Sequence, residues 1–216
     1  MSEHQILFTL DILGTLTFAL NGALTASRRV RLDIVGVLTL GVVTAVGGGM
    51  TRDVLLGDTP PDALKHWYYL ATALGGAAIA WFIARPPRAL ARTIVVFDAI
   101  GLSVFAVAGA QKAVGLGLNP APAILLGAIT AVGGGTIRDV LIREVPSVLT
   151  SDLYAIPALI GAATAVLGGA AGLAPFPAAA LGAILCFGIR MAGVRYRLQA
   201  PSHPPRAPEP PTSRQA

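Results

Sequence analysis

Residues 44–60 read TAVGGGMTRDVLLGDTP, and residues 130–146 read TAVGGGTIRDVLIREVP. The two stretches agree at eleven of seventeen positions without a gap, at an offset of 86 residues. The match extends in both directions and pairs Asp11, Gly14, Phe18 and Gly22 with Asp98, Gly101, Phe105 and Gly109, and Tyr68 and Gly75 with Tyr154 and Gly161. The chain therefore contains an internal repeat.

The chain that carries this repeat is too apolar for a soluble protein. Of its 216 residues, 54% are apolar and only 12% are charged, whereas ordinary globular chains carry roughly 25% charged residues. The mean hydropathy is +0.70. This composition excludes an ordinary cytoplasmic enzyme and a disordered polymer, and the single Cys186 excludes an intrachain disulfide. We expect an integral membrane protein.

Long apolar stretches predict the membrane spans. A helix needs about 20 mostly apolar residues to cross the bilayer core. Seven stretches of this kind fit, and we place them at 6–26, 33–56, 66–84, 94–113, 121–142, 153–172 and 175–194. The first stretch lacks the positively charged start of a signal peptide, so we interpret it as a retained span. The expected fold class is an all-α membrane protein with seven transmembrane helices.

The basic residues predict the orientation of these spans, because cytoplasmic loops carry an excess of Lys and Arg. With the N-terminus outside, the outer loops hold only Lys65 and Lys112. The inner loops and tail then hold Arg28, Arg29, Arg31, Arg85, Arg88, Arg92, Arg143, Arg190, Arg195 and Arg197. We therefore expect the N-terminus outside and the C-terminus in the cytoplasm. The net charge of +5 is accounted for by the membrane, and no nucleic-acid partner is expected.

The repeat divides the chain into four parts. Residues 5–92 form the first repeat with spans 1–3, residues 93–174 form the second with spans 4–6, and residues 175–197 form a seventh span. Because three crossings are an odd number, the two repeats are expected to have inverted topology, which in membrane proteins indicates a solute or ion path at the repeat interface. Residues 198–216 are rich in proline, and we expect a disordered tail.

Two glycine triplets lie inside spans 2 and 5 and comprise Gly47, Gly48, Gly49, Gly133, Gly134 and Gly135. One glycine in a helix costs about 1 kcal/mol relative to alanine, so three in a row predict a break or a sharp kink. A break frees backbone carbonyl groups that can bind a partly dehydrated cation. The alternative is that the glycines only permit close helix packing. We expect a functional break, and with it the ion path.

Each triplet is followed by an Arg-Asp pair, Arg52-Asp53 or Arg138-Asp139. Charges within a span normally face a cavity or a partner. Adjacent helix residues point about 100° apart, so we expect pairing across the repeats, Arg52 with Asp139 and Arg138 with Asp53. Such a cluster is suited either to conduction or to a structural role that holds the repeats together, and the sequence leaves both open.

Further polar residues are placed where they can border the path. Asp11 and Asp98 sit near one end of spans 1 and 4, either as interfacial carboxylates or caps, or as cation-attracting groups at the two mouths. Lys112 is a further candidate for lining the path. Asn21 and Gln111 are expected chiefly as interhelical hydrogen-bond partners. The aromatic Trp67, Tyr68 and Trp81 suit the interfacial belts.

The sequence offers little for catalysis or for a bound metal. The histidines, His4, His66 and His203, are isolated from one another, so we expect no metal-ligand cluster. No nucleophile and base are suitably spaced, so we expect no enzyme and no cofactor. The expected partners are membrane lipid and monovalent cations.

The doubled motif GGGxxRDVL, in two inverted three-span repeats followed by a seventh helix, resembles the prokaryotic trimeric intracellular cation (TRIC) channels. The resemblance covers residues 5–195 and stops at the tail. It implies a homotrimer in which each protomer has its own pore for monovalent cations, chiefly potassium. It also implies that the glycine-kinked second and fifth helices line this pore with the first and fourth. Basic residues near the pore belong to the family picture, and Arg52, Arg138 and Lys112 are the candidates here.

Three functions fit these observations. The resemblance favours a potassium-permeable channel. The same bacterial domain has also been labelled a glycine transporter, and a secondary carrier for glycine or another small solute is the alternative. A scaffold without transport is the third. Within the repeat, Gly57-Asp58 is replaced by Arg143-Glu144, so the two ends of any path are expected to differ electrostatically.

Overall fold

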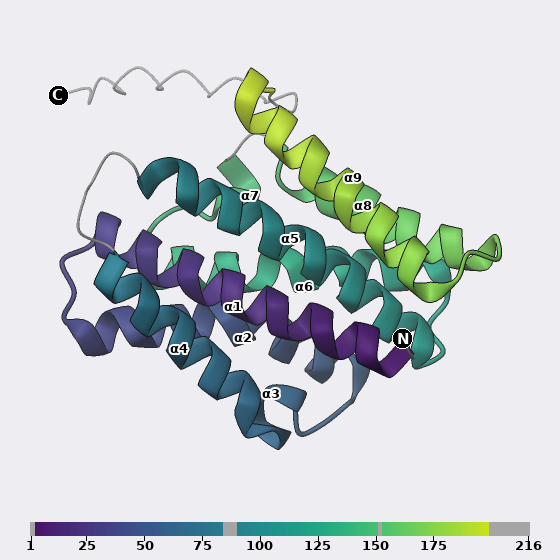
Figure 1. Ribbon diagram of the computed structural model, residues 1–216, viewed down its shortest axis with the longest axis horizontal. Coiled ribbons are helices and arrows are strands. Elements are labelled where there is room, and N and C mark those ends of the chain that lie inside the picture. The colour runs from purple at the N-terminus through teal and green to yellow at the C-terminus, as the bar shows by residue number, and fades with distance from the viewer. Residues whose placement is uncertain (1–2, 84–89, 151–152, 199–216) are drawn as a thin grey trace, which may run out of the picture.

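The computed structural model describes residues 3–83, 90–150 and 153–198, and within these ranges the regular secondary structure is entirely helical (Figure 1). The helices are α1 (Glu3–Arg29), α2 (Ile34–Leu56), α3 (Asp62–Lys65), α4 (Trp67–Ile83), α5 (Leu90–Gly115), α6 (Pro120–Leu141), α7 (Ser147–Thr150), α8 (Ala155–Ala170) and α9 (Pro175–Tyr196). The predicted all-α membrane fold is confirmed at this level. The predicted tail, apart from Leu198, lies outside the described residues, as do Arg85 and Arg88.

Within the described ranges, five helices are long and apolar enough to cross a membrane, namely α1, α2, α5, α6 and α9. Two further apolar helices, α4 and α8, are shorter, with 17 and 16 residues. All seven coincide with the predicted stretches to within a few residues at most ends. The short helices α3 and α7, which precede α4 and α8, were not predicted from the sequence.

Helices α1 and α5 lie side by side at the centre of the bundle (Figure 1). Helices α2 and α4 pack on α1, whereas α6, α8 and α9 pack on α5. The contact between α1 and α5 centres on Phe18 and Phe105, whose ring centroids are 5.3 Å apart. Phe18 of α1 packs against Gly101 of α5, and Phe105 of α5 packs against Gly14 of α1. Each ring occupies the space that a side chain at the glycine would need. The repeat in the sequence thus becomes a reciprocal contact in the core.

The predicted breaks at the glycine triplets are wrong, because α2 and α6 continue through Gly47–Gly49 and Gly133–Gly135. The structure instead fits the alternative of close packing. A Cβ atom on Gly48 would collide with the carbonyl oxygen of Thr130, and one on Gly134 would collide with that of Thr44. Only glycine lets two helix backbones approach this closely. The helical hydrogen bonds therefore continue, and the triplets do not free carbonyl groups for a cation.

Two caps fix the limits of α2. The side chain of Asp33 accepts a hydrogen bond from the Gly36 backbone N–H at 2.8 Å, which satisfies one of the free donors at the helix start. At the other end Gly57 adopts the left-handed conformation, with φ 72°, which glycine reaches without steric cost. The chain then turns toward α3, so that the segment after α2 lies close to Arg52 and Asp53.

Candidate functional site: two buried charge clusters

Among the described residues, the buried charged side chains and the groups that bind them gather in two clusters, one in each half of the molecule. We name them after one member each. The Lys112 cluster contains Asp11, Arg52, Asp53, Asp58, Asp62, Lys65, Tyr69 and Lys112. The Arg190 cluster contains Asn21, Asp98, Arg138, Asp139, Ser147, Tyr154 and Arg190.

In the Lys112 cluster, Arg52 binds two carboxylates. Its Nε donates to Asp53 Oδ1 at 2.9 Å, and its Nη1 donates to Asp11 Oδ1 at 3.2 Å. The hydroxyl of Tyr69 donates to the other oxygen of Asp11 at 3.3 Å. Arg52 and Asp53 are 2% and 1% exposed. Charges this deeply buried are stable only when they are paired and hydrogen-bonded, which these contacts achieve.

The Arg190 cluster repeats this arrangement with different details. Arg138 donates to Asp139 Oδ1 through Nε and Nη2, at 2.8 and 2.6 Å, and through Nη1 to the side-chain oxygen of Asn21. Tyr154 donates to Asp98 Oδ1 at 2.8 Å. Arg190 of α9 adds a second cation beside Asp98, with Nη2 3.5 Å from Oδ2. The seventh apolar helix therefore contributes a charge to this cluster.

The predicted pairing across the repeats is wrong, because each arginine binds the aspartate that follows it in the chain. The Cβ atoms of Arg52 and Asp53 do point in different directions. The arginine side chain is long enough to fold back around the helix, so the direction of its Cβ does not decide its partner. The link between the halves comes instead from Asn21 to Arg138 and from Lys112 to Asp53.

Asp11 and Asp98 are buried, 8% and 7% exposed, and each lies in one of the clusters. Their carboxylates bind arginine and tyrosine side chains, and no hydrogen bond to the start of a helix is seen for them among the described residues. Their tyrosine partners correct one detail of the repeat alignment, because the counterpart of Tyr154 is Tyr69 and not Tyr68. One residue is deleted from the second repeat between Asp139 and Tyr154, which shifts the offset to 85.

Each aspartate of the Arg-Asp pairs also fixes the start of a short helix. Asp53 Oδ2 accepts a hydrogen bond from the Asp62 backbone N–H at 3.0 Å, at the start of α3. Asp139 Oδ2 accepts from the backbone N–H and the hydroxyl of Ser147, at 2.8 and 2.9 Å, at the start of α7. These carboxylates thus hold the loops that follow α2 and α6 against the charge clusters.

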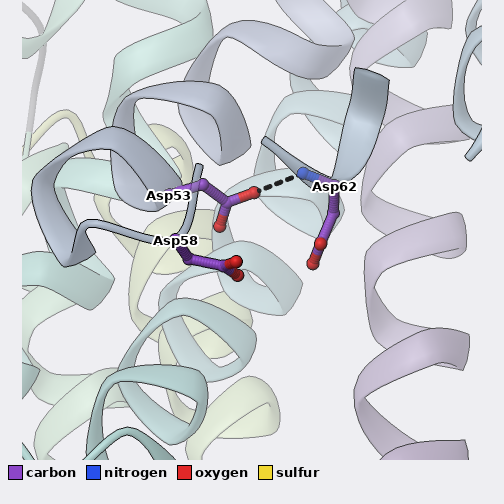
Figure 2. Close-up of side chains that lie close together, drawn as sticks. All are labelled: Asp53, Asp58 and Asp62. Carbon is purple, nitrogen blue, oxygen red and sulfur yellow. Dashed lines mark hydrogen bonds between the residues drawn. The ribbon is translucent and has the colours of Figure 1, made fainter. Parts of the chain in front are cut away.

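Three carboxylates converge at one end of the Lys112 cluster (Figure 2). Asp53, Asp58 and Asp62 offer ligand oxygens that lie within 4.8 Å of one another, a spacing that suits a metal ion. The ammonium group of Lys112 takes this place, with Nζ at 2.7 Å from Asp53, 2.8 Å from Asp58 and 2.7 Å from Asp62. This triad was not predicted from the sequence, because only the histidines were considered as metal ligands.

The two triad members outside the spans show the effect of the lysines. The pKa of Asp58 is lowered to about 2, chiefly because Lys112 and Lys65 donate hydrogen bonds to its carboxylate. Burial raises the pKa of Asp62, but the hydrogen bond and charge of Lys112 outweigh this effect, and the net shift is downward. Both carboxylates are therefore ionised at neutral pH.

The two clusters enclose different amounts of space. The cavity in the Lys112 cluster, lined by Asp11, Arg52 and Asp62 among others, has a volume of about 20 Å³. The cavity in the Arg190 cluster, which Thr25 and Arg138 line, measures about 170 Å³. The first has room for about one water molecule, and the second for several. The charged partners near the two clusters also differ. Glu144 pairs with Arg29, whereas Asp58, its counterpart in the first repeat, binds Lys65 and Lys112.

Asn21 and Gln111 act as interhelical hydrogen-bond partners, as predicted. Asn21 also donates to the Ile94 carbonyl at 2.9 Å, and Gln111 donates to the Pro175 carbonyl at 3.2 Å. Trp67 is 79% exposed at the start of α4, and Tyr68 packs edge-on against Phe8. These aromatic residues lie outside both clusters.

An apolar helical bundle whose charged groups are paired in its interior is an integral membrane protein of the all-helical class. The chain belongs to the family described as "Glycine transporter", which matches residues 8–85 and 95–170. Its relatives include a UPF0126 membrane protein of Streptomyces coelicolor, 50% identical over 207 residues, which covers 96% of this chain and 95% of the relative. The UPF0126 inner membrane protein YadS of Escherichia coli K12 is 39% identical over 200 residues, with 92% and 96% covered.

Solved structures match as closely. The TRIC trimeric intracellular cation channel orthologue from Rhodobacter sphaeroides is 40% identical, with a TM-score of 0.85 over 89% of this chain and 99% of that one. A structure titled for conductance through TRIC cation channels is 33% identical, with a TM-score of 0.84 over 93% and 98%. The resemblance to the TRIC family is therefore confirmed, and the matching solved proteins are channels and not enzymes.

Proposed function

We propose that this protein is a monovalent cation channel of the bacterial inner membrane, permeable to potassium. The observation that carries the proposal is the match, at 40% identity and over nearly the whole of both chains, to a protein titled as a cation channel. The buried carboxylates support it, because ionisable groups inside membrane helices mark ion pathways in many transport proteins. The inner-membrane location is proposed because the relative YadS of Escherichia coli is an inner membrane protein.

We further propose seven crossings, with α4 and α8 spanning despite their length, the N-terminus outside and the C-terminus inside. On this topology residues 5–92 and 93–174 are inverted repeats, and residues 175–197 form the last span. Reciprocal contacts of α1 with α5 and of α2 with α6 support the inverted arrangement. A membrane-impermeant thiol reagent should label Leu173→Cys, but not Arg143→Cys, in intact cells. The reverse pattern would contradict this topology.

The proposed ion path runs within each protomer of a homotrimer, between α1, α2, α5 and α6. The two glycine triplets form its narrow centre, where α2 and α6 touch, and the charge clusters form its two ends. Asp11 and Asp98 supply negative charge at those ends, and Lys112 borders one of them. Because α2 and α6 are continuous helices, the permeating cation contacts side-chain oxygens instead of freed backbone carbonyls. The homotrimer is proposed because the similar protein from Rhodobacter sphaeroides is a trimeric channel.

A small-solute carrier is the second candidate, favoured by the description of the matching family as glycine transporters. The cavity of about 170 Å³ beside Arg138 and Asp98 supports it, because this space presents both charge signs that a zwitterion requires. A carrier would show saturable flux, with its binding site open to one side at a time.

Planar-bilayer recording of the purified protein in a potassium chloride gradient separates these functions. Discrete openings whose reversal potential follows potassium would support the channel, and Asp11→Asn should then reduce the unitary conductance. Arg195→Gln is the matched control, since Arg195 is exposed near the end of α9 and belongs to neither cluster. Electrical silence together with saturable uptake of labelled glycine into liposomes would instead establish the carrier.

A further inference from the structure

Each half of the molecule forms a pocket at the same place in the repeat. The first pocket, of about 310 Å³, is bordered by Arg31 and Trp81. The second, of about 360 Å³, is bordered by Leu118 and Val166. An offset of 87 residues pairs Arg31 with Leu118, and the offset of 85 that applies to α4 and α8 pairs Trp81 with Val166. The two pockets are therefore equivalent in the fold, and the difference between them lies in their side chains.

The side chains around the two pockets differ in charge. Three arginines, Arg28, Arg29 and Arg31, border the first pocket, which we call the arginine pocket. The second pocket is lined by apolar residues and by Gln111. The general excess of basic residues in cytoplasmic loops accounts for arginines in this segment. It does not account for a pocket that brings them together with a tryptophan and other apolar side chains.

Two of these arginines remain available to a ligand. Arg29 pairs with Glu144. Arg28 and Arg31 are exposed, and within residues 3–83, 90–150 and 153–198 their side chains form no ion pair or hydrogen bond. The neighbouring carboxylate of Asp33 accepts a backbone N–H at the start of α2. The loop therefore presents two guanidinium groups beside the pocket, and a guanidinium group binds a phosphate through two parallel hydrogen bonds.

Another part of the pocket wall is apolar. Val37 is buried in the core shared by α1, α2 and α4, and Leu32 and Trp81 pack partly buried against that core. Next to these residues in the chain, Val35 and Phe82 are 65% and 77% exposed. Exposed apolar side chains of membrane helices face lipid, and tryptophan is typical of the boundary between lipid tails and headgroups. The arginine pocket thus combines a cationic and an apolar surface at an edge of the bundle.

We propose that the arginine pocket binds an anionic phospholipid. The headgroup phosphate lies between Arg28 and Arg31, and the glycerol and the upper acyl chain lie against Trp81 and Val37. A free phosphate ion would use the arginines alone, whereas a phospholipid uses both surfaces of the pocket. On the proposed topology this edge faces the cytoplasm, where anionic lipids attract basic segments next to membrane helices. The inference goes beyond the proposed channel and does not depend on which solute the protein transports.

Tryptophan fluorescence tests this proposal directly. The chain has two tryptophans, so Trp67→Phe leaves Trp81 as the single reporter. In vesicles, we compare quenching by phosphatidylglycerol and by phosphatidylcholine that carry bromine in the upper acyl chain. Because each basic residue near an anionic lipid surface contributes a factor of about five, Trp81 should prefer phosphatidylglycerol by about 25-fold. Adding Arg28→Gln and Arg31→Gln should reduce this preference to about one.

Two controls isolate the pocket from general charge attraction. Arg195→Gln with Arg197→Gln removes two exposed arginines at the end of α9, on the same face in the proposed topology, and should leave the preference of Trp81 unchanged. Trp81→Phe makes Trp67 the reporter at the other end of α4, where no preference is expected. Since all the substituted arginines are exposed, each variant should keep the Tm of the wild type in detergent.

Three results would overturn the proposal. The first is an equal preference with and without Arg28 and Arg31, and the second is the same loss in the control variant at the end of α9. The third is displacement of brominated phosphatidylglycerol by millimolar inorganic phosphate, which would identify the pocket as a site for free phosphate. A protein that conducts no cation can still show the expected quenching, so failure of the channel function and failure of the lipid site are distinguishable.

Discussion

Gly48→Ala tests whether the glycine triplets serve for packing or for flexibility. A methyl group on Gly48 would collide with the Thr130 carbonyl oxygen and would lie 3.3 Å from the Gly134 backbone nitrogen. Both obstacles are backbone atoms, so they cannot rotate away, and α2 and α6 must separate. A matched control lies one residue away, because the nearest atom to a Cβ on Gly49 is Nη2 of the Arg52 side chain, at 3.9 Å.

The size of the effect can be estimated from these contacts. Overpacking a tight contact costs about 1–3 kcal/mol, and the upper part of that range applies where backbone is the obstacle. The higher helix propensity of alanine offsets about 1 kcal/mol. Gly48→Ala should therefore destabilise the protein by about 1–2 kcal/mol, which corresponds to a fall in Tm of roughly 2–8 °C for a chain of this size. Gly49→Ala should raise Tm by about 2–4 °C, because it gains propensity without a collision.

The assay is thermal unfolding of detergent-solubilised protein, followed by size-exclusion chromatography of each heated sample. Gly134→Ala should repeat the loss, since its Cβ would collide with the Thr44 carbonyl oxygen. The double variant should cost less than the sum of the two, because one separation of α2 and α6 relieves both collisions. Equal melting temperatures for Gly48→Ala and Gly49→Ala would refute the packing argument and would return the triplets to a role in flexibility.

The charge clusters give three more expected outcomes. Arg52→Ala leaves the buried carboxylate of Asp11 without a counter-charge and should lower the free energy of unfolding by about 3–5 kcal/mol. Adding Asp11→Ala should restore part of the lost Tm. If Asp139→Ala restored it instead, the pairing of Arg52 across the repeats would be supported. Tyr154→Phe removes a 2.8 Å hydrogen bond to Asp98 and should cost about 1.5–3 kcal/mol, so an unchanged Tm would contradict that bond. The folded-state pKa of Asp58, about 2, lies below its ordinary value of 3.8, so its carboxylate stabilises the protein above pH 3.8 and this contribution disappears as the pH falls through about 2. Asp58→Asn should therefore flatten the dependence of Tm on pH between about pH 4 and pH 2, and leave the dependence between pH 5 and 8 unchanged. If the wild type lost Tm between pH 7 and 5 and Asp58→Asn abolished that loss, the lowered pKa of Asp58 would be refuted.

The helices were predictable because a span imposes a simple condition on the sequence, about 20 consecutive apolar residues. The short helices α3 and α7 have four residues each and leave no periodic signal. Their starts are nevertheless visible in retrospect, because Asp62 and Ser147 are residue types common at helix starts. The two breaks were predicted from glycine propensity alone, and tertiary packing overrides propensity when two backbones must touch.

The site was only partly predictable, for a different reason. Arg52, Asp53, Arg138 and Asp139 stand out because charges are rare inside apolar stretches. The acidic triad does not stand out, since Asp58 lies in the loop after α2 and Asp62 begins the short helix α3. Their common partner Lys112 is fifty residues beyond Asp62. Such a contact arises only when α5 packs beside α2, and no local pattern records it.

The collisions that exclude a side chain at Gly48 and Gly134 are reciprocal, since each glycine faces the threonine that precedes the other by four residues. An interface of this form is isologous, which is how two identical subunits meet across a two-fold axis. Identical subunits, however, must present the same residue at both ends of such an assembly. A single chain that contains both halves is free of this restriction, so it can keep a symmetric centre while Arg31 and Leu118 make its two ends unlike.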